Sequence, residues 1–221
     1  MPGYLVKTET FAVGGIDTVV RSLLDRQQFA DPHGEAERLG ISSAAWQMFG
    51  LVWPSALVLA EHLQHLPLGQ RRVLEVGCGL ALASLVVHRR GGHMTASDRH
   101  PLAEAFLLEN LRLNALPPLR YRNVDWSAPN PQLGRYDLIV GSDVLYERDQ
   151  PDELCAFIEA HAQRDAEVVI VDPDRGNRAA FNRGMRGLGF EAREQAVRQL
   201  PGGSVAYKGR LLSYRRGAVG G

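Results

Sequence analysis

The stretch that decides the fold is VLEVGCGLALASLVV, Val73–Val87, with the sequence TASD ending at Asp98 a short distance after it. The apolar residues that open the stretch suit a strand buried on both faces of a parallel sheet. Gly77 and Gly79 allow a sharp turn at the carboxyl end of that strand and let a ligand approach the backbone closely. The apolar residues after the second glycine have helical spacing. The pattern therefore predicts a strand, a glycine turn, a helix and a second strand that ends in an acid.

Two acids accompany the glycine turn. Glu75 lies inside the first strand, where a buried carboxylate is costly unless it is paired. We expect it to accept hydrogen bonds from loop amides or from the amine of a bound cofactor. Asp98 ends the second strand, 19 residues after Gly79, and this position suits a carboxylate that accepts both hydroxyls of a ribose. The segment therefore predicts a site for an adenosine-containing cofactor, with a purely structural turn as the alternative.

The spacing of small residues favours S-adenosylmethionine over a dinucleotide. The dinucleotide fingerprint requires a third glycine three positions after the second, where this chain has Leu82. Gly77, Gly79 and Ala81 instead stand two positions apart, as in the methyltransferase pattern, with alanine in place of the usual last glycine. We expect that replacement to be tolerated because residue 81 opens a helix. A nicotinamide-dependent reductase remains the competing interpretation.

Composition narrows the class of protein. The 221 residues suit one sizeable α/β domain with a small N-terminal addition. The formal net charge is zero, which predicts neither a general nucleic-acid surface nor a charged docking surface. No apolar run approaches about 18 residues, and the N-terminus lacks a signal-peptide pattern. Neither the two cysteines nor the seven histidines have metal-ligand spacing. We expect a cytoplasmic monomer without a metal, bound neither to nucleic acid nor to a membrane.

The rest of the chain alternates between strands and helices, which predicts a parallel sheet with helices on both faces. Strands are expected near 72–76, 93–97, 119–124, 136–141 and 167–172, and helices near 54–66, 80–90, 101–114, 150–163 and 177–187.

Both ends of the chain depart from this alternation. In residues 4–29, two β-rich runs flank Gly14-Gly15 and predict a hairpin; residues 30–49 read as a loop or a short helical segment. At the other end, runs at 189–199 and 205–215 flank Pro201-Gly202-Gly203 and predict a second hairpin. The predicted fold is a Rossmann-like α/β fold with a seven-stranded, mostly parallel sheet, a C-terminal antiparallel hairpin and an N-terminal β-hairpin extension. We place the N-terminal hairpin and a lid segment in 1–45 and the main domain in 46–221.

Further polar and aromatic residues fall at the ends of predicted strands, where open α/β sheets bind ligands. Asp125 can accept from an adenine amino group and Trp126 can stack on a purine; a helix-capping acid beside a core tryptophan is the alternative. Ser142, Asp143 and Tyr146 follow the strand at 136–141 and should face both cofactor and acceptor. Asp143 could instead be a helix N-cap, with Tyr146 a packing residue.

The aromatic residues before the helix at 54–66 form a third cluster. Trp53 precedes Pro54, which fits a first helical turn, and we expect the indole to close over the cofactor unless it is simply a core residue. Trp46 and Phe49 add aromatic surface that could line a substrate lid. The polar segment VDPDRGNR, at 171–178, suggests a loop on the substrate side.

Taken together, these motifs resemble the class I, seven-β-strand S-adenosylmethionine-dependent methyltransferases. Within that class the chain is similar to the family-16 protein lysine methyltransferases and to their bacterial relatives, often labelled nicotinamide N-methyltransferase-like. The resemblance covers roughly residues 46–216. It rests on the shared motifs GLVWPSALVLAEHL, EVGCGLA, the acid Asp98, ENLRLNAL, VDW and SDVLY, the last of which carries that family's Asp-x-x-Tyr.

The resemblance implies roles for individual residues. Cofactor contacts are assigned to Trp53, Glu75, Gly77, Gly79, Asp98, Asp125, Trp126 and, by its position, Ser142. Asp143 and Tyr146 are the implied catalytic residues of the acceptor pocket.

The implied reaction is N-methylation of a protein lysine with S-adenosyl-L-methionine as donor. Methylation of a small nitrogen-containing acceptor, such as a nicotinamide-like heterocycle, is the alternative enzyme activity. A cofactor-binding module without catalysis is the alternative from another class, and intact Asp143 and Tyr146 argue against it. The Asn/Asp-Pro-Pro-aromatic signature of base methylation is absent, which disfavours a nucleic-acid substrate.

Overall fold

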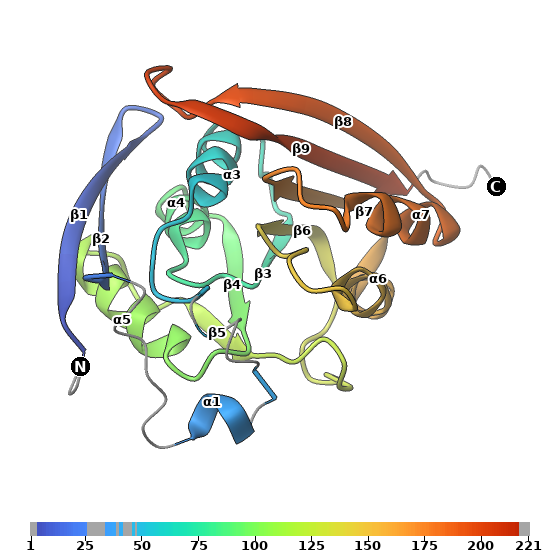
Figure 1. Cartoon of the computed structure of the whole chain (residues 1–221), viewed down its shortest axis with the longest axis horizontal. Helices are drawn as coiled ribbons and strands as arrows, with labels where there is room; N and C mark the ends of the chain where they lie inside the picture. Colours follow the sequence, from blue (N-terminus) through green and yellow to red (C-terminus); the bar gives the residue numbers. More distant parts are fainter. Residues whose placement is uncertain (1–3, 26–33, 39, 42–45, 47, 217–221) are drawn as a thin grey trace.

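In the computed structural model, residues 4–25, 34–38, 40–41, 46 and 48–216 are described. Their centre is a seven-stranded sheet with the strand order β5-β4-β3-β6-β7-β9-β8 (Figure 1). The parallel strands are β3 (Arg72–Val76), β4 (His93–Asp98), β5 (Arg120–Asn123), β6 (Tyr136–Ser142) and β7 (Ala162–Asp172). The antiparallel strands β8 (Phe190–Gln199) and β9 (Ala206–Arg216) complete the sheet beside β7. The predicted mostly parallel sheet with a C-terminal hairpin is confirmed.

Helices cover both faces of this sheet, as the apolar character of its strands predicts. On the side of the N-terminal hairpin lie α3 (Pro54–His65), α4 (Leu82–Arg89) and α5 (Ala103–Leu113), and on the other side lie α6 (Gln150–His161) and α7 (Arg178–Gly187) (Figure 1). Each face has its own cluster of buried apolar side chains. A short helix, α1 (Glu35–Arg38), precedes α3 in the chain. No helix in the described part of the chain combines the length and apolarity needed to cross a bilayer.

The N-terminal hairpin forms where the glycine pair predicts it. Strands β1 (Val6–Val13) and β2 (Ile16–Leu23) pair antiparallel through a two-residue turn. Both turn residues, Gly14 and Gly15, have positive φ angles of 56° and 76°, which is the requirement of a type I′ hairpin turn.

The free edge of β2 is covered by Asn110 of α5 and by Asn114, the C-cap residue of that helix. The side-chain oxygen of Asn110 accepts from the backbone N–H of Arg21 at 2.7 Å. The side chain of Asn114 accepts from the N–H of Val19 at 2.9 Å and donates to the carbonyl of Val19 at 2.6 Å. These bonds satisfy backbone groups that an uncovered edge strand would leave open. The ENLRLNAL motif thus docks the hairpin onto the domain.

Two sequence expectations differ from, or fall outside, the described structure. Strand β7 begins at Ala162 instead of 167, because α6 passes directly into extended backbone at that residue. The lid segment and the boundary predicted at residue 45 fall largely on 26–33 and 42–45, which lie outside the described residues. The division into two domains stays a prediction.

The topology places the carboxyl ends of β3 and β6 side by side, because β3 pairs with β4 on one side and with β6 on the other. This is the point at which the strand order reverses, where open α/β sheets bind their ligands.

Candidate active site

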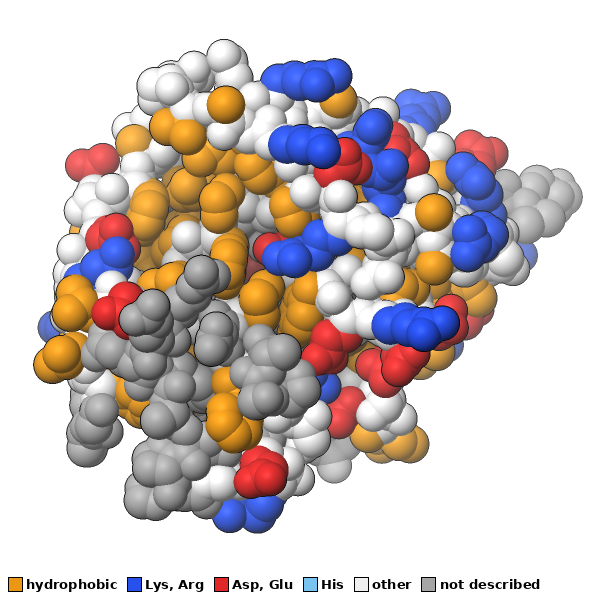
Figure 2. Space-filling model, in the orientation of Figure 1, with side chains coloured by type: hydrophobic (Ala, Val, Ile, Leu, Met, Phe, Trp, Pro, Cys, Tyr) orange, Lys and Arg blue, Asp and Glu red, His pale blue; other side chains and the backbone are white. Residues whose placement is uncertain are grey.

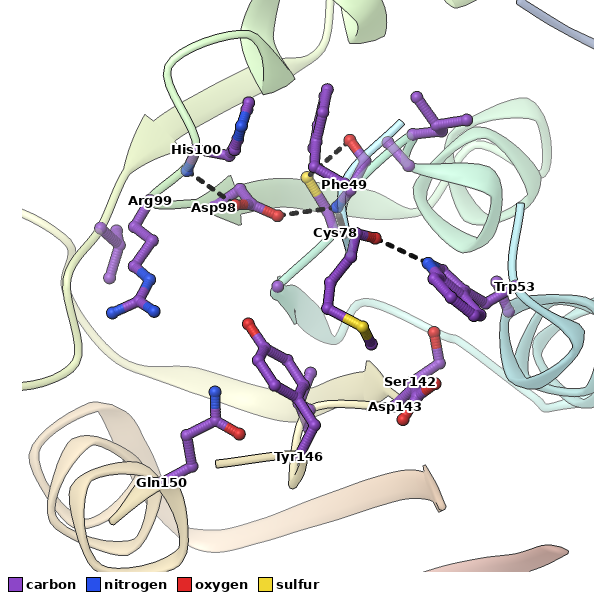
Figure 3. A pocket seen from close by; sticks show the side chains of 18 of the residues that line it. Phe49, Trp53, Cys78, Asp98, Arg99, His100, Ser142, Asp143, Tyr146 and Gln150 are labelled. Atoms are coloured by element: carbon purple, nitrogen blue, oxygen red, sulfur yellow. Dashed lines mark hydrogen bonds between the residues drawn. The ribbon is translucent and has the colours of Figure 1, made fainter. Parts of the chain in front are cut away.

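One cleft opens at the carboxyl ends of β3, β4 and β6, and most of the predicted site residues line it (Figure 3). Those that do are Trp53, Gly77, Gly79, Asp98, Asp125, Trp126, Ser142, Asp143 and Tyr146. Figure 2 shows apolar side chains in the middle of this face of the molecule.

The two glycines of the turn are required for different reasons. Both have positive φ, 59° for Gly77 and 52° for Gly79, a conformation that glycine adopts without steric cost. A Cβ on Gly77 would lie 2.9 Å from Cγ1 of Val144, so this position also needs the space. A Cβ on Gly79 would meet no described atom within 4 Å. The backbone at Gly79 is therefore open to the cleft.

Glu75 is not among the residues that line the cleft, and its cofactor contact stays a prediction. Its Oε2 accepts from the backbone N–H of Ser84 at 2.9 Å and from the Ser84 hydroxyl. Ser84 is the third residue of α4, whose N-cap, Ala81, offers no side-chain cap. Glu75 thus satisfies an N–H that the start of a helix leaves unpaired. Burial raises the pKa of Glu75 to about 7.

Ala81 corrects another expectation. It precedes the helix as its N-cap with φ 63° and ψ 31°, the left-handed conformation. For a residue with a Cβ this conformation costs about 1 kcal/mol. Alanine is therefore accommodated here with backbone strain, and the proximity of a helix start is not the reason that it fits.

Asp98 links β4 to the glycine turn. Its Oδ2 accepts from the N–H of Gly79 at 2.8 Å, and its Oδ1 accepts from the N–H of His100 at 2.8 Å. Each carboxylate oxygen can accept more than one hydrogen bond, so the group can still accept from the hydroxyls of a ligand. Burial raises the pKa of Asp98.

His100 is a cleft residue that the sequence analysis left unassigned. It is buried, lines the cleft and stacks on Phe49 with ring centroids 3.8 Å apart and planes 5° from parallel (Figure 3). The available signal is its position two residues after Asp98, at the carboxyl end of a strand.

Three further aromatic and acidic side chains form the walls. Trp126 is half-buried and packs against the apolar cluster on the α6 side of the sheet, while Asp125 accepts from the N–H of Ser127 at 2.9 Å. Trp53 lies at the N-cap of α3 and its indole N–H donates to the carbonyl of Met48 at 2.7 Å. Trp53, Asp125 and Trp126 all line the cleft, so neither tryptophan is purely a core residue.

Asp143 adopts an unusual conformation at the end of β6. Its φ is 56°, and its N–H donates to the carbonyl of Val171 at 2.8 Å. No helix starts here, since α6 begins at Gln150, and the N-cap alternative is therefore wrong. Such strain in a non-glycine residue is concentrated at functional sites.

Tyr146 projects into the cleft from the same loop (Figure 3). Its side chain packs against Ile41, as does that of Trp46. Burial raises the pKa of the Tyr146 phenol, so the group stays protonated at neutral pH. Of the two aromatic residues expected near a substrate lid, Phe49 lines the cleft, while Trp46 packs against Ile41 behind it.

Arg175 is the residue that the sequence analysis missed. Its guanidinium binds the carboxylate of Asp143 with two hydrogen bonds, from Nε at 2.5 Å and from Nη2 at 3.0 Å. Arg175 belongs to the polar loop after β7, and that loop is tied to the loop of Asp143 by Asn177, which donates to the carbonyls of Leu145 and Glu147. The polarity of the VDPDRGNR segment was the available signal.

No cluster of three or more His, Cys, Asp or Glu that could hold a metal occurs within the described ranges. Both cysteines are buried, and burial raises the pKa of each thiol.

A family model described as lysine methyltransferase matches residues 37–181. The chain belongs to this family. The matched segment runs from α1 into α7 and includes all the residues that line the cleft.

Curated relatives agree with this membership. The chain is 33% identical over 129 residues to protein N-lysine methyltransferase METTL21A of Xenopus tropicalis, with 54% of this chain and 60% of the relative covered. It is 33% identical over 135 residues to the electron transfer flavoprotein beta subunit lysine methyltransferase of Xenopus laevis, with 58% and 52% covered. It is 29% identical over 124 residues to histone-arginine methyltransferase METTL23 of Rattus norvegicus, with 53% and 55% covered. The matches thus span less than two thirds of each relative.

Solved structures share the fold. The T. thermophilus 16S rRNA N2 G1207 methyltransferase, in complex with AdoMet and guanosine, superposes with a TM-score of 0.66 at 18% identity, covering 96% of this chain and 51% of that one. Magnesium protoporphyrin IX methyltransferase from Synechocystis PCC 6803, with bound SAM, gives a TM-score of 0.59 at 17% identity, with 87% and 95% covered. At these identities the likeness establishes the methyltransferase fold.

Proposed function

We propose that this chain is an S-adenosylmethionine-dependent N-methyltransferase that methylates a lysine side chain of a protein. The observation that carries the proposal is that the glycine turn with Asp98 and the Asp143–Tyr146 pair line the same cleft. A donor held at the turn and an amine held at Asp143 would therefore share one space. S-adenosylmethionine supplies an electrophilic methyl group when it is bound.

The residues at the turn fit that cofactor. Gly79 leaves open space in which a ligand can approach the backbone, and Asp98 has acceptor capacity left for ribose hydroxyls. Asp125 and Trp126 stand at the end of the neighbouring strand, where they can bind and stack on an adenine. Trp53 closes the cleft from the start of α3.

The acceptor side has to receive an amine and remove its proton. Being neutral at pH 7 costs a lysine about 4.6 kcal/mol, from a reference pKa of about 10.4. Apolar walls such as Trp53 and Tyr146 lower that cost, because desolvation disfavours the ammonium. Asp143 orients the nitrogen by accepting a hydrogen bond. A carboxylate is poorly matched in pKa to an ammonium, so water carries the proton away.

Two observations support a protein as acceptor over a small heterocycle. The curated relatives include lysine methyltransferases of named proteins. The charges are also unevenly distributed along the chain, although they sum to zero. Residues 178–216 contain nine Arg and Lys and two Glu, while the rest of the chain contains 16 basic and 23 acidic residues. Lys and Arg gather over β8, β9 and α7 in Figure 2. A macromolecular acceptor can use a basic surface of this kind.

A second candidate is methylation of an arginine. It is favoured by the bidentate binding of Arg175, which demonstrates that a guanidinium fits the carboxylate of Asp143. The arginine methyltransferase METTL23 is among the relatives. We also propose that the protein is a cytoplasmic monomer and that its acceptor is not a nucleic acid.

The test is methylation of a cell lysate with tritiated S-adenosylmethionine, followed by separation into protein, nucleic-acid and small-molecule fractions and by mass spectrometry. Label on a protein lysine supports the proposal, and label on a protein arginine supports the second candidate. Label confined to small molecules or nucleic acid contradicts both. The Asp143→Ala variant serves as the control for methylation by contaminating enzymes.

A further inference from the structure

We propose that Arg175 occupies, in the free protein, the place that the cationic side chain of the acceptor takes at Asp143. The acceptor then has to displace the Arg175 guanidinium before its nitrogen reaches the carboxylate. The inference rests on the proposed function and adds to it a residue that determines which acceptors bind.

Asp143 needs a counter-ion in the free protein. The Asp143 side chain is only 7% exposed, and both of its oxygens bind the guanidinium of Arg175. A carboxylate buried this far without a cation would strongly destabilise the protein. The free protein therefore needs a positive charge at this point, and the loop after β7 supplies it. A bound ammonium or guanidinium meets the same need.

Asp143 and Arg175 differ in mobility. Asp143 is fixed by its left-handed backbone and by the bond from its N–H to Val171. The side chain of Arg175 is 35% exposed. It can therefore turn toward solvent while Asp143 stays in place.

The loop that carries Arg175 can stay in place during this exchange. The N–H of Arg175 donates to Oδ1 of Asp172 at 2.8 Å, and Asn177 binds the carbonyls of Leu145 and Glu147. These bonds hold the backbone on both sides of Arg175. Only the side-chain torsions of one residue have to change.

The exchange gives the site a charge preference. A neutral acceptor that displaces Arg175 leaves the Asp143 carboxylate without a counter-ion, whereas a cationic acceptor replaces one charge pair by another. Neutral heterocycles are therefore disfavoured at this site.

The experiment is calorimetric titration of the protein, loaded with S-adenosylhomocysteine, with n-butylammonium and with n-propylguanidinium as probes of the lysine and arginine side chains. Arg175→Ala is expected to bind at least one probe about tenfold more tightly than the wild type, which corresponds to about 1.4 kcal/mol. Arg175→Lys keeps a competing charge and should fall between the two. Asp143→Asn should bind neither probe.

Weaker probe binding by Arg175→Ala than by the wild type would overturn the inference, since it would make Arg175 a support for Asp143. Absence of probe binding in both proteins would overturn it as well. The affinity for S-adenosylhomocysteine, unchanged in Arg175→Ala, serves as the control for folding. If the folded wild type does not bind S-adenosylhomocysteine at all, the proposed function fails, and that result is distinct from the two above.

A second measurement separates displacement from simple repulsion by a nearby charge. The Nε–H of Arg175, observed by NMR, should exchange slowly with solvent in the loaded protein because it binds Asp143. Exchange should accelerate when n-butylammonium is added. Probe binding with Arg175 still protected would overturn the displacement.

Discussion

Oδ2 of Asp98 lies 2.8 Å from the backbone nitrogen of Gly79. This bond joins the ends of two neighbouring parallel strands, so the acid and the glycine turn act as one unit. A change at either residue therefore alters the position of the other, and the cleft depends on both.

The two glycines of the turn should respond differently to alanine. Gly79→Ala places a methyl group in open space, so we expect a loss of stability of about 1 kcal/mol from the left-handed backbone. The same methyl group blocks the approach of the cofactor, and affinity for S-adenosylhomocysteine should fall at least about tenfold. Gly77→Ala also collides with Val144, and we expect the larger loss of stability, about 2–4 kcal/mol. Urea denaturation and calorimetry measure both quantities; equal effects of the two variants on stability would contradict this division.

Glu75 should make stability depend on pH. Burial raises its pKa to about 7 in the folded protein from an ordinary 4.5, so the folded state binds the proton more tightly than the unfolded state. The stabilisation is complete below the unfolded pKa and is lost as the pH rises through the folded pKa. Relative to Glu75→Gln, the wild type should lose about 2 kcal/mol of unfolding free energy between about pH 5 and about pH 8. A difference that stays constant over this range would show that Glu75 is not perturbed.

Asp143 should affect turnover without affecting cofactor binding. Asp143→Ala removes the group that orients the acceptor nitrogen, and we expect kcat to fall about 100-fold or more. Asp143→Asn is the matched control, because asparagine tolerates the left-handed backbone but carries no charge. S-adenosylhomocysteine should bind both variants within about threefold of the wild type. Loss of that affinity as large as in Gly79→Ala would contradict the separate roles of the two residues.

Asn110 of α5 and Asn114, the C-cap residue of that helix, should contribute to stability without contributing to chemistry. Asn114→Ala leaves the N–H and the carbonyl of Val19 without their partner, and we expect a loss of about 1–3 kcal/mol of unfolding free energy. Leu108→Ala, at an exposed position of the same helix, is the control and should change stability by less than about 0.5 kcal/mol. If the two variants have the same stability, the hairpin is held mainly by its apolar contacts.

The fold was predictable because its signals are local. The apolar strand, the glycine turn and the acid Asp98 fall within the single segment 73–98, and the two hairpins are marked by Gly14-Gly15 and by Pro201-Gly202-Gly203. The same locality explains why the predicted strands and helices agree closely with the structure.

The partners that were not predicted depend on how the elements pack. Glu75 binds Ser84, nine residues later in the chain, and Asp143 binds Arg175, 32 residues later. Asp143 can be assigned to a strand end from the sequence, but its partner is decided by how two loops pack. Glu75 lies inside β3, and its partner lies in the first turn of the following helix. Glu75 was expected to accept from loop amides or from a cofactor amine, and it accepts from the amide of Ser84. Arg175 could only be suspected from the polarity of its loop.

The central claim is that the Gly77–Gly79 turn and Asp98 hold S-adenosylmethionine. Calorimetric titration of the wild-type protein with S-adenosylhomocysteine tests it most directly. We predict saturable binding at one molecule per chain, and no binding of a nicotinamide dinucleotide. Absence of heat with both S-adenosylmethionine and S-adenosylhomocysteine, on well-folded protein, would contradict the claim.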